Sequence, residues 1–340
     1  MATGDHLVAN KGQSFQGSNV LGLGKGFIVT PEQAHDLIQR DPRNKDVLFP
    51  YLNGEDLNSR PDCSASRWVI NFHDWSEERA RGYPEVFAII ERDVKPERLK
   101  NTNRQRREIW WRFTRPAMDL YRAISNLDRV LVVARVSRTA MATIVPTGQV
   151  LNEKIVLFAS DRVDVMALLN SSIHVLWAWK YSATLKSDLQ YTPSDCFETF
   201  PMPQHLLLLE SPGKNLSETR TVIMRNRECG LTKLYNLVND PQVSASDISE
   251  LRECHKAVDE AVAEAYEWGD LDLGHGFHET RNGVRFTVAP VAQNEILDRL
   301  LELNHTRFNR EADAASRERL EKSLMRDSEG VVALHGDTLF

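Results

Sequence analysis

The chain has 340 residues, of which 41% are hydrophobic and 26% are charged, and its formal net charge is −6. This length accommodates two domains with separate cores, and a mean hydropathy of −0.41 is that of a globular rather than a membrane-embedded protein. The most apolar run, residues 163–179, contains Asp164, Asn170 and His174, so it predicts a buried helix instead of a membrane span.

Two features of the sequence predict a cytoplasmic protein with no membrane partner. Residues 1–17 contain no basic stretch followed by an apolar core, which argues against a secretory signal. The four cysteines show no CxxC spacing, and free thiols in a reducing compartment are the simplest account of them.

Positive charge is concentrated in the middle of the chain. Between Arg92 and Arg138 there are thirteen Lys and Arg against five Asp and Glu, whereas the C-terminal third is rich in acids. The distribution of charge matters more than its sum for nucleic-acid contact. The pattern therefore predicts one surface that faces phosphate groups.

In chain order, residues 1–11 are expected to form a flexible lead-in, and the Gly-punctuated run at 19–30 predicts a strand, a turn and a strand. Thr30-Pro31-Glu32-Gln33 combines a capping Thr, a Pro at the first helical position and a Gln three residues on, which predicts a helix to about Arg40. The next expected elements are a turn around Asn53-Gly54, a strand at 67–72, and helices at about 76–92 and 104–126.

Three apolar segments at 129–137, 141–149 and 153–160 predict a β-meander with a Pro-Thr-Gly turn. A buried helix at 162–180 follows, and the first domain, residues 12–204, is expected to end near Gln204.

The remaining residues, 205–340, are expected to form a mainly helical domain used for packing or docking. Apolar residues from Ile248 to Ala265 recur at helical spacing, and a second amphipathic helix opens near Pro290. The Gly-rich segment between them allows a short hairpin. The predicted fold class is therefore α+β, a mixed domain with flanking helices followed by a helical one.

The stretch Thr184-Leu185-Lys186-Ser187-Asp188-Leu189-Gln190-Tyr191 places a donor, an acceptor and an amide at alternate positions. In an extended strand, Lys186, Asp188 and Gln190 would point to one face. That face is either a solvated strand surface or a set of polar groups that contacts a ligand.

No catalytic or metal site is expected. The GLGKG run lacks a complete phosphate-binding pattern, no Asp/Asn-Pro-Pro-Tyr/Phe tetrapeptide is present, and the loop pair His275/His278 lacks partners at metal-ligand spacing. Asp62, Asp93 and Lys95 fit a PD-(D/E)xK nuclease pattern, in which two carboxylates hold Mg²⁺, and this alternative stays open.

The segment RLKNTNRQRREIWWRFTR mixes arginines with Trp110 and Trp111. It reads either as a phosphate-contacting surface or as a solvated helix face with the Trp pair in the core. The candidates for DNA contact are Arg104, Arg106 and Arg107 here, and Arg135 and Arg138 further along.

Several motifs occur in an order that resembles a known family: SFQGSNVLGLGKGFIVTPEQA, LFPYLNGEDLNSRPD, SRWVINFHDW, DRVLVVARVS and YTPSDCFETFPMP. Together they look like the target recognition region of the MmeI-like branch of type IIG restriction–modification enzymes and their adenine methyltransferase relatives. LRECHKAVDEAVAEAYEWGDLDLGHGF resembles the domain that follows it in that family, and the resemblance covers about residues 12 to 310.

The resemblance implies sequence-specific binding of duplex DNA on behalf of a separate adenine-N6 methyltransferase module. S-adenosylmethionine would bind that partner and not this chain. In the family, two residues of a Leu-x-Ser-x motif are implicated in base choice, and the matching positions here are Lys186 and Asp188. Lys can donate to guanine, Asp can accept from the paired cytosine, and Gln190 could read a neighbouring adenine. A docking protein with a vestigial DNA surface remains an alternative.

Overall fold

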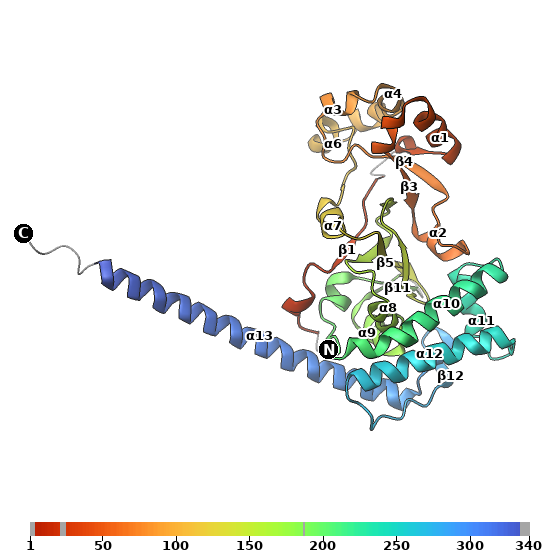
Figure 1. Ribbon diagram of the computed structural model, residues 1–340, viewed down its shortest axis with the longest axis vertical. Coiled ribbons are helices and arrows are strands. Elements are labelled where there is room, and N and C mark those ends of the chain that lie inside the picture. The colour runs from red at the N-terminus through yellow and green to blue at the C-terminus, as the bar shows by residue number, and fades with distance from the viewer. Residues whose placement is uncertain (1–3, 21–24, 186–187, 334–340) are drawn as a thin grey trace, which may run out of the picture.

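The computed structural model describes residues 4–20, 25–185 and 188–333, and gives only the backbone of residue 25 and of residues 318–333. It has an α+β architecture of two lobes joined by a narrow waist, with a long C-terminal helix, α13 (Pro290–Ala333), that projects away from the body (Figure 1). None of the helices in this described part combines the length and the apolar character needed to cross a membrane.

The smaller lobe is built on a four-stranded sheet with its own core. Its strand order is β2 (Ile28–Val29), β4 (Arg67–Ile70), β3 (Leu48–Leu52) and β8 (Val150–Leu151), and β8 pairs in parallel with β3. The helices of this lobe are α1 (Pro31–Arg40), α3 (Glu77–Arg81), α4 (Pro84–Asp93), α5 (Lys95–Leu99) and α6 (Arg104–Glu108), with the short 3-10 helices η2 (Lys25–Phe27) and η3 (Pro42–Asp46).

Local sequence signals located α1 correctly. The Thr30 side chain accepts from the Gln33 backbone N–H at 3.2 Å, and the Gln33 side chain accepts from the Thr30 N–H at 3.0 Å. This reciprocal capping box satisfies two backbone donors that would otherwise have no partner, so the helix begins where the sequence predicted it.

Two predicted helices of this lobe are wrong in extent. The segment 76–92 forms two helices, α3 and α4, because Gly82 ends the first and Pro84 begins the second. The predicted helix 104–126 is absent: α6 ends at Glu108, and α7 (Met118–Ala123) is a separate helix that begins after Pro116. A proline inside a helix removes a hydrogen bond and clashes with the preceding turn.

The segment around Asn53-Gly54 also differs from the predicted turn. The Asn53 side chain accepts from the backbone N–H groups of Glu55 and Asp56, at 2.8 and 3.0 Å, and so caps the helix α2 (Gly54–Ser59). Asn is both a turn former and a good N-cap, and the sequence pattern alone does not separate the two roles.

The larger lobe contains the central sheet, with strand order β1 (Ser14–Gln16), β9 (Ile155–Phe158), β5 (Arg129–Ala134) and β7 (Thr143–Pro146). The three predicted strands are present, but the order is not that of a meander, because β9 pairs with β5 and not with β7. Between β7 and β9 the chain crosses to the other sheet as β8 and returns on the opposite edge of β5.

Residues 4–11, the described part of the expected flexible lead-in, are held in place by long-range contacts. The Asn10 side-chain amide, within the short helix η1 (Val8–Asn10), donates to the carbonyls of Phe197 and Phe200, at 3.0 and 2.7 Å, and Leu7 is buried. Long-range partners therefore order a segment whose local sequence carries no signal for structure. Phe197 ends a single π turn, Pro193–Phe197.

The predicted buried helix is two helices, α8 (Val163–Asn170) and α9 (Ser172–Tyr181). Ser171 lies between them in an extended conformation, and its side chain caps α9 by accepting from the His174 N–H at 3.1 Å. A Ser within an apolar run can lie inside a helix, or it can begin a new helix because its side chain accepts from a backbone N–H.

Helices of the C-terminal part continue the core of the larger lobe. After η5 (Leu206–Leu209) come α10 (Glu210–Asn226), α11 (Leu231–Val238) and α12 (Ser246–Ala265), and the predicted apolar stripe of α12 is confirmed. The hairpin of β12 (Gly276–Thr280) and β13 (Gly283–Thr287) leads into α13. One apolar cluster runs from Leu52 to Leu300, across the domain boundary predicted at residue 204.

A buried histidine in this core makes stability depend on pH. His174 is 2% exposed, its Nε2 lies 2.9 Å from the Tyr191 hydroxyl, and burial lowers its pKa from 6.5 to about 3. Below pH 6.5 the unfolded chain takes up a proton at this residue that the folded chain does not. The free energy of unfolding should therefore fall by about 1 kcal/mol from this residue alone between pH 6 and pH 5.

Urea unfolding of wild type and of His174→Gln at pH 7, 6 and 5 measures this contribution, with His6→Gln as an exposed control. The His174 variant should lose less stability on acidification than wild type does, and the control should follow wild type. Parallel losses in all three proteins would contradict the assignment.

Candidate nucleic-acid interface

The segment expected to carry base-reading residues is a hairpin and not one extended strand. β10 (Ala183–Leu185) pairs antiparallel with β11 (Asp188–Gln190), and the register places Leu185 opposite Asp188. Residues 186 and 187, which connect the two strands in sequence, lie outside the described residues, and Lys186 is one of them. The stretch is therefore two antiparallel strands and not the single extended strand considered from the sequence.

Within β11, Asp188 and Gln190 share one face because side chains alternate along a strand. Leu189 points to the opposite face and is 1% exposed. Because its side chain is buried in the core, the face with Asp188 and Gln190 must point outward. Both polar side chains are half-buried. The structure therefore places an acceptor and an amide side by side on the outer face of a short strand.

The third strand of this sheet brings Arg138 to the outer face of β11, whereas Arg135 lies on the side of the buried Leu189. β6 (Val136–Ser137) pairs with β11, with Val136 opposite Gln190. Arg138 follows β6, and its Nε donates to Asp188 Oδ1 at 3.3 Å, between side chains that are 63% and 37% exposed. A pair this open to water contributes about 0–1 kcal/mol, so both groups can exchange partners at little cost.

Arg135 precedes β6 and holds two sheets together through its backbone. Its N–H donates to the Lys154 carbonyl at 2.8 Å, and its carbonyl accepts from the Tyr191 N–H at 2.7 Å. The position of β11 is thus fixed relative to the central sheet.

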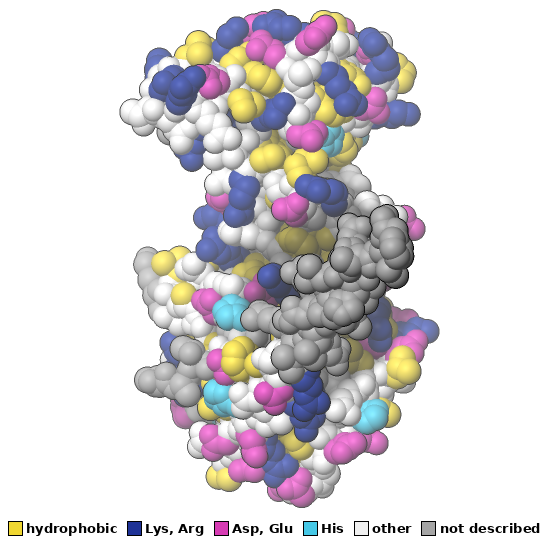
Figure 2. Space-filling view, turned by 90° about the vertical axis from the view of Figure 1, so that its left-hand side faces the viewer, with side chains coloured by type: hydrophobic (Ala, Val, Ile, Leu, Met, Phe, Trp, Pro, Cys, Tyr) yellow, Lys and Arg dark blue, Asp and Glu magenta, His cyan; other side chains and the backbone are white. Residues whose placement is uncertain are grey.

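The other predicted arginines lie in the smaller lobe, on α6, and are not brought together with β11 (Figure 1). Arg104 pairs with Glu108 at 2.6 Å, and Arg107 donates to the carbonyls of Asn101 and Thr102, at 2.7 and 2.9 Å. Arg106 contacts a small cavity. Figure 2 shows Lys and Arg side chains on the smaller lobe and at the waist.

The neighbouring tryptophans serve the core. Trp110 and Trp111 are 4% and 8% exposed, their rings meet edge to face at 6.1 Å, and Trp111 Nε1 donates to the Trp75 carbonyl at 2.9 Å. The Trp pair therefore belongs to the core, although it does not sit on a helix, and its burial leaves open whether the arginines of this segment contact phosphate.

The residues of the alternative nuclease pattern do not converge. Asp62 accepts from the Ser64 hydroxyl, Asp93 pairs with Arg92, and Lys95 pairs with Glu91. In Figure 1, α2, which Asp62 follows, lies beside the larger lobe, whereas α4, which ends at Asp93, lies at the far end of the smaller lobe. Within the described residues, no three His, Cys, Asp or Glu side chains are grouped so that they could hold a metal ion.

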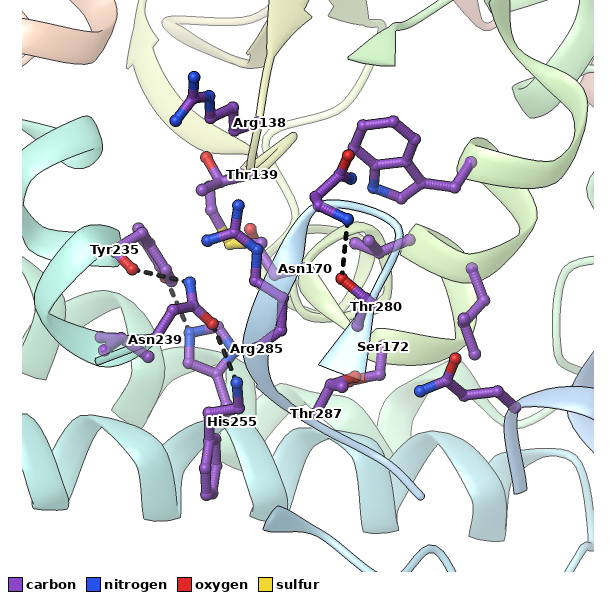
Figure 3. Close-up of a pocket in the computed structure, with 18 of the residues that line it drawn as sticks. Arg138, Thr139, Asn170, Ser172, Tyr235, Asn239, His255, Thr280, Arg285 and Thr287 are labelled. Carbon is purple, nitrogen blue, oxygen red and sulfur yellow. Dashed lines mark hydrogen bonds between the residues drawn. The ribbon is translucent and has the colours of Figure 1, made fainter. Parts of the chain in front are cut away.

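A pocket of about 490 Å³ lies beside Arg138, between α9, α11, α12 and the β12–β13 hairpin (Figure 3). Arg285 on β13 enters it from the hairpin, and both burial and the charge of Arg138 lower the Arg285 pKa. Trp179 and Phe286 contribute an apolar wall. The sequence gives no signal for this pocket, because its walls come from elements far apart in the chain.

Two histidines of the pocket have structural roles. His255 Nε2 lies 2.8 Å from the Tyr235 hydroxyl, and burial lowers its pKa to about 4, so the ring is neutral at pH 7. His275, for which the sequence predicts a loop, lies 2.9 Å from the buried Asp259 carboxylate. His278 lies 2.9 Å from the Gly274 carbonyl.

Comparisons with known proteins place the chain in a family. Residues 8–204 match the sequence model of the MmeI target recognition domain. The structure of the type IIL restriction–modification enzyme MmeI in complex with DNA superposes with a TM-score of 0.61 at 20% identity, over 87% of this chain and 36% of that one. This chain therefore spans about a third of the length of that enzyme.

A second solved structure, the type IIG restriction endonuclease BpuSI, covers 79% of this chain and 32% of its own at 14% identity. Its TM-score of 0.32 is too low to indicate a shared fold. No curated protein sequence matches the chain.

The buried Asp259 gives a test of how the pocket is held together. Its carboxylate accepts from the Ser172 N–H at 2.6 Å and bonds His275 at 2.9 Å, so it joins α9 and the segment before β12 to α12. Removing one partner of a buried polar pair typically costs about 3–5 kcal/mol. Asp259→Ala should lower the free energy of unfolding by about 3 kcal/mol, measured in urea at pH 7.

Glu260→Ala, at the adjacent and largely exposed position on α12, is the matched control and should stay within about 0.5 kcal/mol of wild type. Equal effects at the two positions would show that Asp259 does not hold these elements together.

Proposed function

The chain belongs to the family of MmeI target recognition domains, and from this premise we propose that it reads a specific sequence in duplex DNA for a restriction–modification system. The observation that carries the proposal is the outer face of the β6–β11 pair. There Asp188, Gln190 and Arg138 present an acceptor, an amide and a guanidinium on adjacent strands. These are the three chemistries that distinguish base pairs in the major groove.

Each side chain has a matching base edge. Asp188 accepts from cytosine N4, Arg138 donates both guanidinium branches to guanine O6 and N7, and Gln190 bonds adenine N6 and N7. Because the Arg138–Asp188 pair is exposed and weak, replacing it with contacts to one G·C pair costs little. Lys186 remains a proposed donor to guanine on the basis of sequence.

Arginines in the smaller lobe and at the waist supply sequence-independent affinity. Phosphate contacts from Arg release counterions, so binding weakens steeply as salt rises. Arg104 and Arg107 have partners within the chain, whereas the Arg106 side chain has no hydrogen bond or ion pair among the described residues. Arg106 is therefore the foremost phosphate contact among the predicted residues of α6.

The methyltransferase itself belongs to a separate module. The tetrapeptide Asp/Asn-Pro-Pro-Tyr/Phe, which holds a flipped adenine in aminomethyltransferases, does not occur in this sequence. We propose an adenine-N6 methyltransferase as the partner, with S-adenosylmethionine bound there, in the cytoplasm where the DNA is. The MmeI structure, of which this chain covers 36%, has ample length for such a module.

Selection of bound duplexes from a random-sequence pool at near-physiological salt tests the proposal. Wild type should enrich one motif. Asp188→Ala should relax the preference at a single G·C position by about tenfold or more, because one base-edge contact discriminates by about 1–3 kcal/mol. Asp119→Ala, which removes the same charge at an exposed site on α7, should enrich the wild-type motif unchanged.

If wild type enriches no motif, the isolated chain does not read DNA. The alternative of a docking protein would then be the better description, with the helical part as the partner-binding surface. If Asp188→Ala and Asp119→Ala change the motif equally, the hairpin is not the reading surface.

A further inference from the structure

A second, smaller cavity lies in the other lobe, between α5, α6 and the segment that leads to Pro116. Its volume is about 290 Å³. It is lined mainly by cationic and hydrogen-bonding side chains: Arg98, Asn103, Gln105, Arg106, Arg112 and Thr114. No Asp or Glu is among the described residues that line it.

Arg98 is the unusual member of this group. It is 2% exposed, and its Nη2 is buried with no hydrogen-bond partner. No ion pair engages its side chain among the described residues, and the ring centre of Phe27 lies 5.8 Å from the guanidinium carbon. A buried charge without a partner is strongly unfavourable, so such a group is expected to meet a ligand.

Thr114 gives a second, independent observation of the same kind. Its hydroxyl oxygen is buried and also has no partner. The Arg112 guanidinium is held in place by its Nε, which donates to the Trp75 carbonyl at 2.8 Å. Its terminal N–H groups make no hydrogen bond among the described residues. One cavity therefore collects two unsatisfied buried groups and a fixed arginine.

The positive charges around the cavity favour an anionic ligand. Burial first, and then the positive charge of Arg106, lowers the pKa of the Arg98 guanidinium. Two like charges held this close repel each other, and an anion between them would remove that repulsion. Planar guanidinium forks with a hydroxyl match the oxygens of a tetrahedral phosphate.

We propose that this cavity is a phosphate site, in which Arg98, Arg106 and Arg112 hold the oxyanion and Thr114 donates its hydroxyl. The phosphate comes either from the backbone of the bound duplex or from a free phosphate ion. The first source rests on the proposed function and would anchor the smaller lobe to DNA away from the reading hairpin. The second does not depend on DNA binding.

The test compares the full-length wild type with Arg106→Gln and Arg104→Gln. Both substitutions remove one charge from α6, but Arg104 does not line the cavity and pairs with Glu108. Arg106 is half-buried at the rim, so its replacement leaves the buried Arg98 in place. Thr114→Val provides a second cavity variant that keeps the charge.

The first arm titrates inorganic phosphate at constant ionic strength and follows the thermal midpoint of unfolding. Wild type and Arg104→Gln should show a saturable rise, which should need at least tenfold more phosphate in Arg106→Gln and Thr114→Val. The second arm measures DNA affinity against salt. The slope of log K against log salt should be less steep, by about 0.9, in Arg106→Gln than in Arg104→Gln.

A change in both arms identifies a backbone phosphate, a change in the first arm alone identifies a free phosphate, and a change in the slope alone identifies a site specific for the phosphodiester. The proposal is overturned if phosphate has no saturable effect and the two arginine variants have the same slope. Because the phosphate arm needs no DNA, it gives a result even if the chain enriches no motif.

Discussion

The strand β5 and its continuation into β6 are the constraint on which the rest of the molecule depends. β5 is paired on both edges, to β9 and to β7, and every residue of the strand after Arg129 is buried. Its continuation then leaves this sheet and pairs with β11. One stretch of ten residues, 129–138, therefore serves two sheets, and the Arg135 backbone hydrogen bonds fix the angle at which it passes from one to the other.

This arrangement explains how a short, exposed hairpin can present side chains in a defined geometry. A two-stranded hairpin is marginally stable by itself in water. Here β11 is stabilised by pairing with β6 on one edge and by the burial of Leu189 beneath it. The polar face with Asp188 and Gln190 is then held by a rigid support, which is the condition for selecting a base by hydrogen bonds.

Charge is used differently in the two lobes. Around the hairpin, Arg138 and Asp188 neutralise each other in water, where the pair is weak and replaceable. In the smaller lobe, Arg98 is buried without an ion-pair partner among the described residues, and the apolar core of this lobe offsets the cost. The first arrangement suits a contact that discriminates between bases, and the second suits a contact that holds a phosphate.

Local and collinear signals in the sequence determined the α+β class, the membership of the recognition family, the capped start of α1 and the apolar stripe of α12. Each rests on neighbours within a few residues or on motif order, which a single chain displays directly. Tertiary structure alone decided the strand order around β5, the hairpin at β10–β11, the pairing of Arg138 with Asp188 and the cavity at Arg98. These depend on partners brought together by long-range pairing and on which side chains lose water, and neither is encoded in spacing along the chain.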